Sequence, residues 1–239
     1  MKLIVRCVSA LLIAGLARAV FAEQSGGIMK SFRVEADLAP SADPDSERWK
    51  AVPGVYAERD PFGKPLPEAR TEVRSIWTGQ NLYFLFISRY ETLYPRPNPT
   101  PEKEAWGLWD YDVVEVFIGS DLENINLYKE FEVSPDGEFI DLDVDRSQKG
   151  KEVDWKWNSG MRYKTQIDRG RKVWTCEMQI PWKSIDARTP KPGNELRLNL
   201  YRIEGGPPSR KYIAWQPVHN PSYHTPERFG RLLLADGLR

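Results

Sequence analysis

The chain has 239 residues, 41% of them hydrophobic, and its 34 basic side chains balance 34 acidic ones. A chain of this size can bury one sizeable core, or at most two small ones. Its charge does not favour nucleic acid or an anionic membrane as a partner.

Residues 1–22 have the pattern of a secretory signal peptide. Two basic residues precede an apolar stretch at residues 8–16, and small residues follow it. We expect cleavage after Ala22 or Ala19, which leaves residues 23–239 as one secreted or periplasmic domain with three more acidic than basic side chains. The apolar stretch is too short to act as a permanent membrane anchor. The alternative is an ordinary N-terminal helix.

Ten short runs of apolar or alternating residues follow, separated by turn residues, and this pattern is typical of an all-β fold. Tight turns at residues 79–80, 135–137 and 168–171 join consecutive runs, which indicates antiparallel pairing. We therefore predict a two-sheet antiparallel β-sandwich of the immunoglobulin-like kind. The predicted strands are 71–78, 81–90, 113–119, 127–134, 138–144, 160–167, 172–180, 195–203, 212–216 and 230–234.

Two long loops interrupt this regular pattern. The first, residues 91–111, contains four prolines and then Trp106 and Trp109. The second, residues 220–230, leads into the last strand. Loops of such length inside a compact domain are usually functional or disordered, and the aromatic residues argue against disorder.

The strand at residues 113–119 is apolar on both faces except at Glu115. A buried carboxylate must be paired, hydrogen-bonded or part of a ligand site, because it is costly when left alone. Trp109 lies just upstream, and an aromatic ring beside an inward-facing acid is typical of a sugar site. The competing interpretation is a structural ion pair with one of three arginines, Arg74, Arg197 or Arg202.

One cysteine remains after residues 1–22 are removed, and three aspartates mark a candidate cation site. Cys176 alternates with apolar neighbours, which predicts a buried, inert thiol and excludes cysteine-based zinc binding. Asp141, Asp143 and Asp145 alternate along a strand end, so a calcium ion would relieve their mutual repulsion. Arg146 stands where a helix-loop-helix calcium loop needs glycine, so a solvated sheet face is the alternative.

Six segments, in this order and spacing, resemble the family 9 carbohydrate-binding modules, a family within the wider group of DOMON-like sandwich domains. The resemblance covers nearly all of residues 30–235. It implies a two-sheet sandwich, binding of sugar chain ends between two aromatic rings, and structural calcium in some members. The segments are TEVRSIWTGQNLYFLF (71–86), WDYDVVEVFIGSD (109–121), YKEFEVSPDGEFIDL (128–142), WTCEMQIPWKSI (174–185), LRLNLYRIEG (196–205) and YHTPERFGRLLL (223–234).

The resemblance also implies roles for individual residues. Trp109 matches one aromatic plate, and Glu115 matches an acid that hydrogen-bonds sugar hydroxyls. Tyr223 stands where the second plate is tryptophan in characterised modules, and Asn220 lies near a polar ligand contact. Glu132 occupies a position where such modules carry arginine, which reverses the charge offered to the ligand.

Trp106 and His224 complete the predicted ligand-binding set. The predicted protein is an exported, monomeric, non-catalytic binder of mono-, oligo- or polysaccharide that serves carbohydrate catabolism, with no required cofactor.

Three alternatives remain open at this point. A b-type haem domain would use Met161 with His219 or His224 as axial ligands. A glycoside hydrolase would use Glu115 with Asp112 or another acid. A third alternative is a non-sugar ligand or a structural role at the cell surface.

Overall fold

The computed structural model describes residues 27–238, and the predicted signal peptide at residues 1–22 lies outside this range. Within the range the fold is nearly all-β, with thirteen strands and one four-residue α-helix, α1 (Trp182–Ile185). The strands are β1 (Ile28–Arg33), β2 (Val55–Ala57), β3 (Thr71–Trp77), β4 (Asn81–Arg89), β5 (Val113–Gly119), β6 (Leu127–Val133), β7 (Phe139–Asp145), β8 (Val153–Asp154), β9 (Arg162–Asp168), β10 (Val173–Pro181), β11 (Glu195–Glu204), β12 (Lys211–Ala214) and β13 (Gly230–Ala235).

All ten predicted strands are present, with ends within two residues of those expected. The three additional strands are β1, β2 and β8. Single 3-10 turns lie at Pro67–Ala69, Leu108–Asp110 and Pro226–Arg228. No helix in residues 27–238 is long and apolar enough to cross a membrane.

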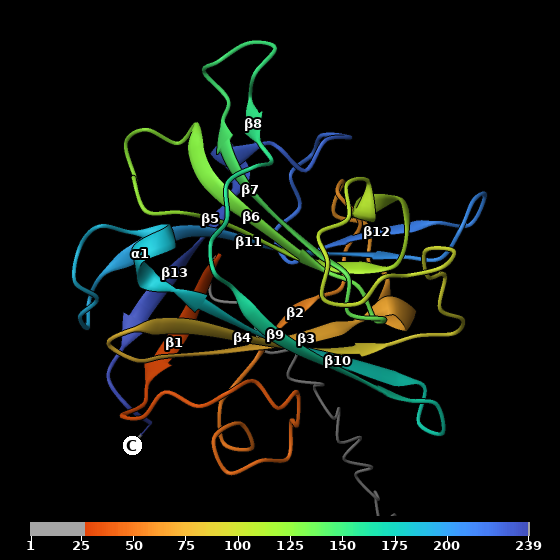
Figure 1. The fold of residues 1–239 in the computed structure, drawn as a ribbon, viewed down its shortest axis with the longest axis horizontal. Coiled ribbons are helices and arrows are strands. Elements are labelled where there is room, and N and C mark those ends of the chain that lie inside the picture. Colours follow the sequence, from red (N-terminus) through yellow and green to blue (C-terminus); the bar gives the residue numbers. More distant parts are fainter. Residues whose placement is uncertain (1–26, 239) are drawn as a thin grey trace, which may run out of the picture.

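The strands form one continuous hydrogen-bonded sheet instead of the two separate sheets that we expected. Its order is β8-β7-β6-β5-β11-β13-β1-β3-β4-β10-β9, with β12 on β11 and β2 on β3. The sheet curls, so that the half containing β5, β6, β7 and β11 faces the half containing β3, β4, β9 and β10 (Figure 1).

Strand β1 joins the two halves, and its pairing is parallel, contrary to the expected all-antiparallel arrangement. Ile28 to Phe32 pair with β13, and Phe32 and Arg33 pair with β3. The remaining ladders are antiparallel. The two-sheet description is therefore not confirmed, because β1 bridges the corner at which a sandwich would open.

The main core fills the space between the two halves. It is built from alternate residues of facing strands, such as Phe84 and Phe86 on β4 and Val114 and Val116 on β5. Cys176 is fully buried in this core, as predicted. Since one face of β5 packs into the main core, Val113, Glu115 and Phe117 must point to its other face.

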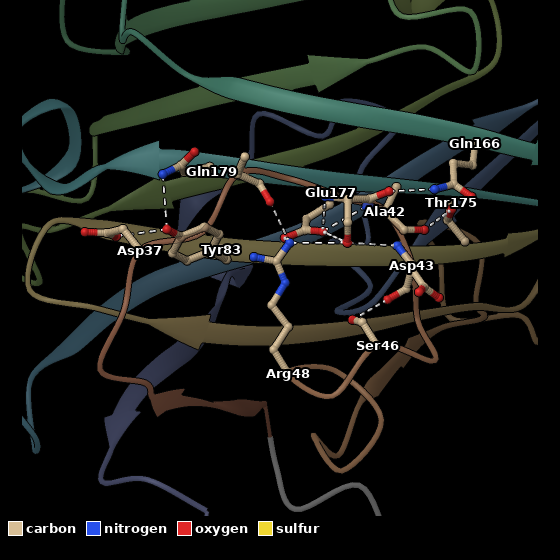
Figure 2. A network of polar contacts seen from close by, with 12 residues as sticks. Asp37, Ala42, Asp43, Ser46, Arg48, Tyr83, Gln166, Thr175, Glu177 and Gln179 are labelled. Carbon is tan, nitrogen blue, oxygen red and sulfur yellow. Dashed lines mark hydrogen bonds and ion pairs between the residues drawn. The ribbon is translucent and has the colours of Figure 1, made fainter.

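Residues 34–52 cover the outer face of β3, β4 and β10 (Figure 2). Glu177 on β10 is fully buried there, and its carboxylate accepts the backbone N–H of both Ser41 and Ala42 at 2.9 Å. Arg48 forms an ion pair with it at 2.6 Å. This buried carboxylate is therefore compensated by both hydrogen bonds and charge.

Candidate functional site

A cavity of about 340 Å³ opens on the outer face of β5, β6, β7 and β11. Its floor comes from these strands, and its walls come from the two long loops and from β8 and β12. The lining residues are Trp106, Trp109, Asp110, Glu115, Phe117, Glu130, Glu132, Leu142, Val153, Ile203, Tyr212, Pro221, Tyr223 and His224.

Strand register places three glutamates on the floor. Glu115 on β5 is directly opposite Glu132 on β6, and Phe117 is opposite Glu130. Because Glu130 and Glu132 are two residues apart on one strand, they share a face. Leu142 on β7 is opposite Glu130 and continues the floor.

The three carboxylates form a buried acidic cluster, which we call the glutamate triad (Glu115, Glu130 and Glu132). Their exposed fractions are 2%, 3% and 1%. One carboxylate oxygen of each lies within 4.8 Å of the others, so the triad is the one group among residues 27–238 whose spacing suits a bound cation. Glu115 Oε1, Glu130 Oε2 and both oxygens of Glu132 are buried without a hydrogen-bond donor from outside the triad in the described residues, and the Glu130 and Glu132 carboxyl groups hydrogen-bond to each other.

Burial and mutual repulsion favour the protonated forms of the triad. Burial raises the pKa of Glu115 well above its usual value, and the charge of Glu130 adds to this effect. The pKa of Glu132 is likewise raised well above normal by burial and by the charges of Glu115 and Glu130. For Glu130, burial raises the pKa to about 7. Glu130 therefore exchanges a proton near neutral pH, and the raised pKa values of Glu115 and Glu132 favour their protonated forms.

His224 forms the wall next to Glu130. Its Nδ1 lies 2.6 Å from the hydroxyl of Tyr128, and its Nε2 lies 3.9 Å from Glu130 Oε2. Burial lowers the pKa of His224 to about 4, with a further contribution from the positive charge of Arg146. The imidazole is therefore neutral at physiological pH and does not compensate the triad.

The first long loop carries two tryptophans to the cavity. Gly107 has a φ of 79°, a left-handed conformation that suits glycine, and it starts the 3-10 turn that holds Trp109. The rings of Trp106 and Trp109 meet edge to face at 5.0 Å between centroids. Trp106 is 57% exposed, and its ring also approaches that of Trp155 at 6.3 Å. Aromatic surface therefore extends from the cavity to the protein surface.

The second long loop supplies Tyr223, which is only 9% exposed. Its ring stacks on Tyr201 at 3.9 Å with an interplanar angle of 9°. One face of Tyr223 is thus covered by protein, and a ligand can reach only the other face. The expected second aromatic plate is therefore a largely buried lining residue, and its stacking on a sugar stays a prediction.

The structure gathers five of the six predicted ligand-binding residues at one cavity: Trp106, Trp109, Glu115, Tyr223 and His224. Asn220 is the exception. It is exposed, and its Oδ1 accepts the backbone N–H of Ser222 at 2.9 Å, so the side chain caps its own loop instead of lining the cavity.

Glu132 was noted from the sequence because of its charge, but Glu130 was not predicted as a residue of the site. The alternation Glu130, Phe131, Glu132 was the available signal, since it puts two acids on one face of a strand. Asp110, Tyr212 and the aliphatic lining residues were also missed, because only the strand register and the loop paths bring them together.

The three aspartates proposed for calcium do not form a joint site in the described structure. Phe139, on their face of β7, packs on the main core, so they lie opposite the cavity. Asp141 accepts hydrogen bonds from the backbone and hydroxyl of Ser159, and Asp143 pairs with Lys129 at 2.5 Å. Asp145 accepts hydrogen bonds from residues 147 and 148. Each carboxylate is engaged separately.

The arginines considered as partners of Glu115 are engaged elsewhere among residues 27–238. Arg74 pairs with Glu72 at 2.7 Å, and Arg202 pairs with Glu204 at 3.2 Å. Arg197 donates to the carbonyl of Pro226. The structure therefore leaves Glu115 facing the cavity without the proposed ion pair.

The residues required by the haem alternative do not converge at one site. Met161 packs in the main core, whereas His224 lines the cavity on the other face of β6, and His219 is exposed. Asp112 is absent from the cavity lining, and its carboxylate accepts the N–H groups of Tyr94 at 3.0 Å and Gly205 at 2.6 Å. Asp112 therefore anchors two loops and does not join Glu115. Glu130 and Glu132 do lie beside Glu115, so a hydrolase that uses another acid stays an untested prediction.

Comparison with known proteins shows the family to which this chain belongs. A family model described as "Carbohydrate family 9 binding domain-like" matches residues 46–237. An "Extracellular protein" of Arthroderma benhamiae is 27% identical over 200 residues, covering 78% of this chain and 87% of that protein. "Endo-1,4-beta-xylanase A" of Thermotoga neapolitana is 23% identical over 188 residues, covering 78% of this chain and 16% of the xylanase.

Solved structures give the same result for the fold. A family 9 carbohydrate-binding module of Caldicellulosiruptor kristjanssonii in complex with cellotriose has a TM-score of 0.64 at 14% identity, covering 89% of this chain and 95% of that one. Its complex with glucose has a TM-score of 0.63 at 14% identity, covering 88% and 97%. At this identity the likeness shows the fold, and the family model spans most of the chain. The protein therefore belongs to carbohydrate-binding module family 9.

Proposed function

We propose that this protein binds the end of a sugar chain, or a single sugar, in the cavity above the glutamate triad, without catalysing its cleavage. The observation that carries the proposal is the convergence of Trp106 and Trp109 with three buried carboxyl groups at one cavity of about 340 Å³. Aromatic faces bind the C–H side of a sugar ring, while carboxyl groups hydrogen-bond its hydroxyls. Membership of a carbohydrate-binding family supports this function.

The size and shape of the site support a small ligand with an extension. The cavity volume lies at the lower end of the range for small-molecule sites. Trp106 and Trp155 continue the aromatic surface outside the cavity. The first sugar would therefore occupy the cavity, and following residues of an oligosaccharide would contact these tryptophans.

We also propose that the protein acts outside the cytoplasm in the breakdown of carbohydrate. The signal-peptide pattern of residues 1–22 and the similar extracellular protein of Arthroderma benhamiae support export. The similar segment of a xylanase supports a role beside carbohydrate-degrading enzymes.

Isothermal titration with glucose, cellotriose and xylotriose tests sugar binding and the role of Trp109. We expect binding of at least one sugar and a loss of affinity of about tenfold or more in Trp109→Ala, because the apolar area lost is worth more than about 1.4 kcal/mol.

Phe32→Ala is the matched control, since this aromatic residue packs on the opposite half of the sheet. It should leave the affinity unchanged. Unchanged binding in Trp109→Ala would contradict the proposed site, and release of reducing sugar during the titration would contradict a non-catalytic role.

A further inference from the structure

The glutamate triad differs from the other buried acids of this fold in having no donor group from another residue beside it, since Glu130 and Glu132 hydrogen-bond to each other. Glu177 is as deeply buried, but two backbone N–H groups and Arg48 surround it (Figure 2). Asp112 receives two backbone N–H groups. At the triad, four carboxylate oxygens are buried without a hydrogen-bond donor from outside the triad among residues 27–238. Buried unpaired oxygens call for an explanation, and a ligand in the adjoining cavity would supply the missing donors.

The groups that face the triad do not supply a positive charge. His224 is neutral because its pKa is lowered to about 4. Asp110, which also lines the cavity and pairs with Arg210 at 3.7 Å, adds to the repulsion felt by Glu132. The ligand that best suits this floor is therefore a cation, which offsets the repulsion among the carboxylates.

The spacing of the triad matches a protonated primary amine. An ammonium group has three N–H donors on a tetrahedral centre and no acceptor. Charge-assisted N–H···O bonds of about 2.8 Å in this geometry place the acceptor oxygens about 4.6 Å apart. The triad oxygens lie within 4.8 Å of one another. One N–H for each carboxylate therefore fits the observed arrangement.

The walls favour an organic cation over a metal ion. Calcium takes six to eight oxygen ligands, but the side chains next to the triad are mainly aromatic and aliphatic, including Phe117, Leu142, Ile203 and Tyr223. Zinc favours nitrogen and sulfur ligands. Tryptophan and tyrosine faces instead attract organic cations and stack on the ring that carries them.

We propose that this cavity selects amino sugars with a free amine, whose ammonium group donates one hydrogen bond to each of Glu115, Glu130 and Glu132. This inference rests on the proposed function, because it names the class of sugar that the same site binds. Neutral sugars offer hydroxyl donors to the triad but bring no positive charge that would stabilise its ionised form. N-acetylation removes the charge and two of the three donors.

Titration at pH 7 with three matched sugars tests the proposal: glucosamine, glucose and N-acetylglucosamine. We expect glucosamine to bind at least about tenfold more tightly than either of the others, because its ammonium group forms charge-assisted hydrogen bonds that the neutral sugars lack. Glu132→Gln should remove this preference. Glu195→Gln, at a partly exposed carboxylate on β11 that pairs with Arg231, is the control and should retain it.

Proton release gives a second readout. Ammonium binding ionises carboxyl groups whose pKa values are raised, so glucosamine should release protons to the buffer, whereas glucose should release fewer. Comparing binding heats in two buffers of different ionisation enthalpy measures the difference.

The outcomes separate the two proposals. Equal or tighter binding of glucose overturns the amine preference and leaves sugar binding intact. If no sugar binds, both proposals fail. Binding of calcium chloride alone, lost in Glu132→Gln, overturns the amine assignment in favour of a metal ion.

Discussion

At the residue scale, three buried glutamates determine which ligand the cavity is proposed to bind. The sequence alone identified Glu115, because it interrupts an apolar strand, and Glu132, because its charge departs from the family pattern. It could not show that the two are cross-strand neighbours, since that depends on the register of β5 against β6. Nor could it show that the arginines weighed as partners are engaged elsewhere.

Glu132→Gln is expected to stabilise the ligand-free protein at pH 8 by an amount on the order of 1 kcal/mol. The pKa of Glu132 is raised by burial and by the charges of Glu115 and Glu130, so the folded state retains a proton that the unfolded state has lost. Stability is then highest below the unfolded pKa of about 4.5 and falls as pH rises through the folded pKa. Glutamine stays neutral at every pH, so the variant does not lose this stability as the pH rises.

Thermal unfolding at pH 5 and pH 8 measures the effect. The melting temperatures of Glu132→Gln and the parent should be close at pH 5 and should diverge by about 2–4 °C per kcal/mol at pH 8. Comparing variant and parent cancels the contribution of His224, whose lowered pKa acts in the opposite direction between pH 4 and 6.5. If the variant is less stable than the parent at pH 8, the prediction is wrong, because the ionised Glu132 carboxylate must then be stabilised by its surroundings in the folded protein.

At the element scale, the alternation of residues predicted the ten longer strands because period-two patterning records which face is buried. It missed β2 and β8, which have three and two residues and are too short to show a period. It also missed β1, whose inward positions include Ser31, a polar residue that hydrogen-bonds Ser75 at 2.8 Å. Because β1 pairs with both β13 and β3, it joins what would otherwise be two sheets into one continuous sheet.

Gly230→Ala is expected to destabilise the protein by about 1–3 kcal/mol, because the junction of β13 with the start of β1 has no room for a methyl group. A Cβ at Gly230 would lie 2.5 Å from the carbonyl oxygen of Gly27 and 2.8 Å from the ring of Trp215. Urea unfolding measures the loss.

Gly79→Ala is the matched control, in the exposed turn between β3 and β4, where a Cβ meets no atom within 4 Å. Its unfolding free energy should stay within about 0.5 kcal/mol of the parent. Equal stability of the two variants would contradict the tight junction.

At the scale of the whole molecule, the curled sheet has two outer faces with different roles. Residues 34–52 cover one face, where Glu177 is fully engaged. The other face carries the cavity, beneath the two long loops. The buried carboxylate of Asp112 anchors the first of them through the backbone N–H of Tyr94. The sheet thus holds the three glutamates at fixed positions, while the loops supply the aromatic walls of the cavity.

The family resemblance and the two long loops together predicted residues of the cavity that composition could not. Five of six predicted residues line one cavity although their positions span residues 106–224. Asn220 falls outside it, because a side chain in a turn can be engaged by its own backbone, and sequence alone does not reveal that choice.

A crystal structure of the protein with glucosamine bound tests the central claim most directly. We predict that the sugar ring lies against Trp109 in the cavity, and that its amine lies within about 3 Å of an oxygen from each of Glu115, Glu130 and Glu132. A sugar bound on another face of the molecule, with the triad cavity free of it, would contradict the account.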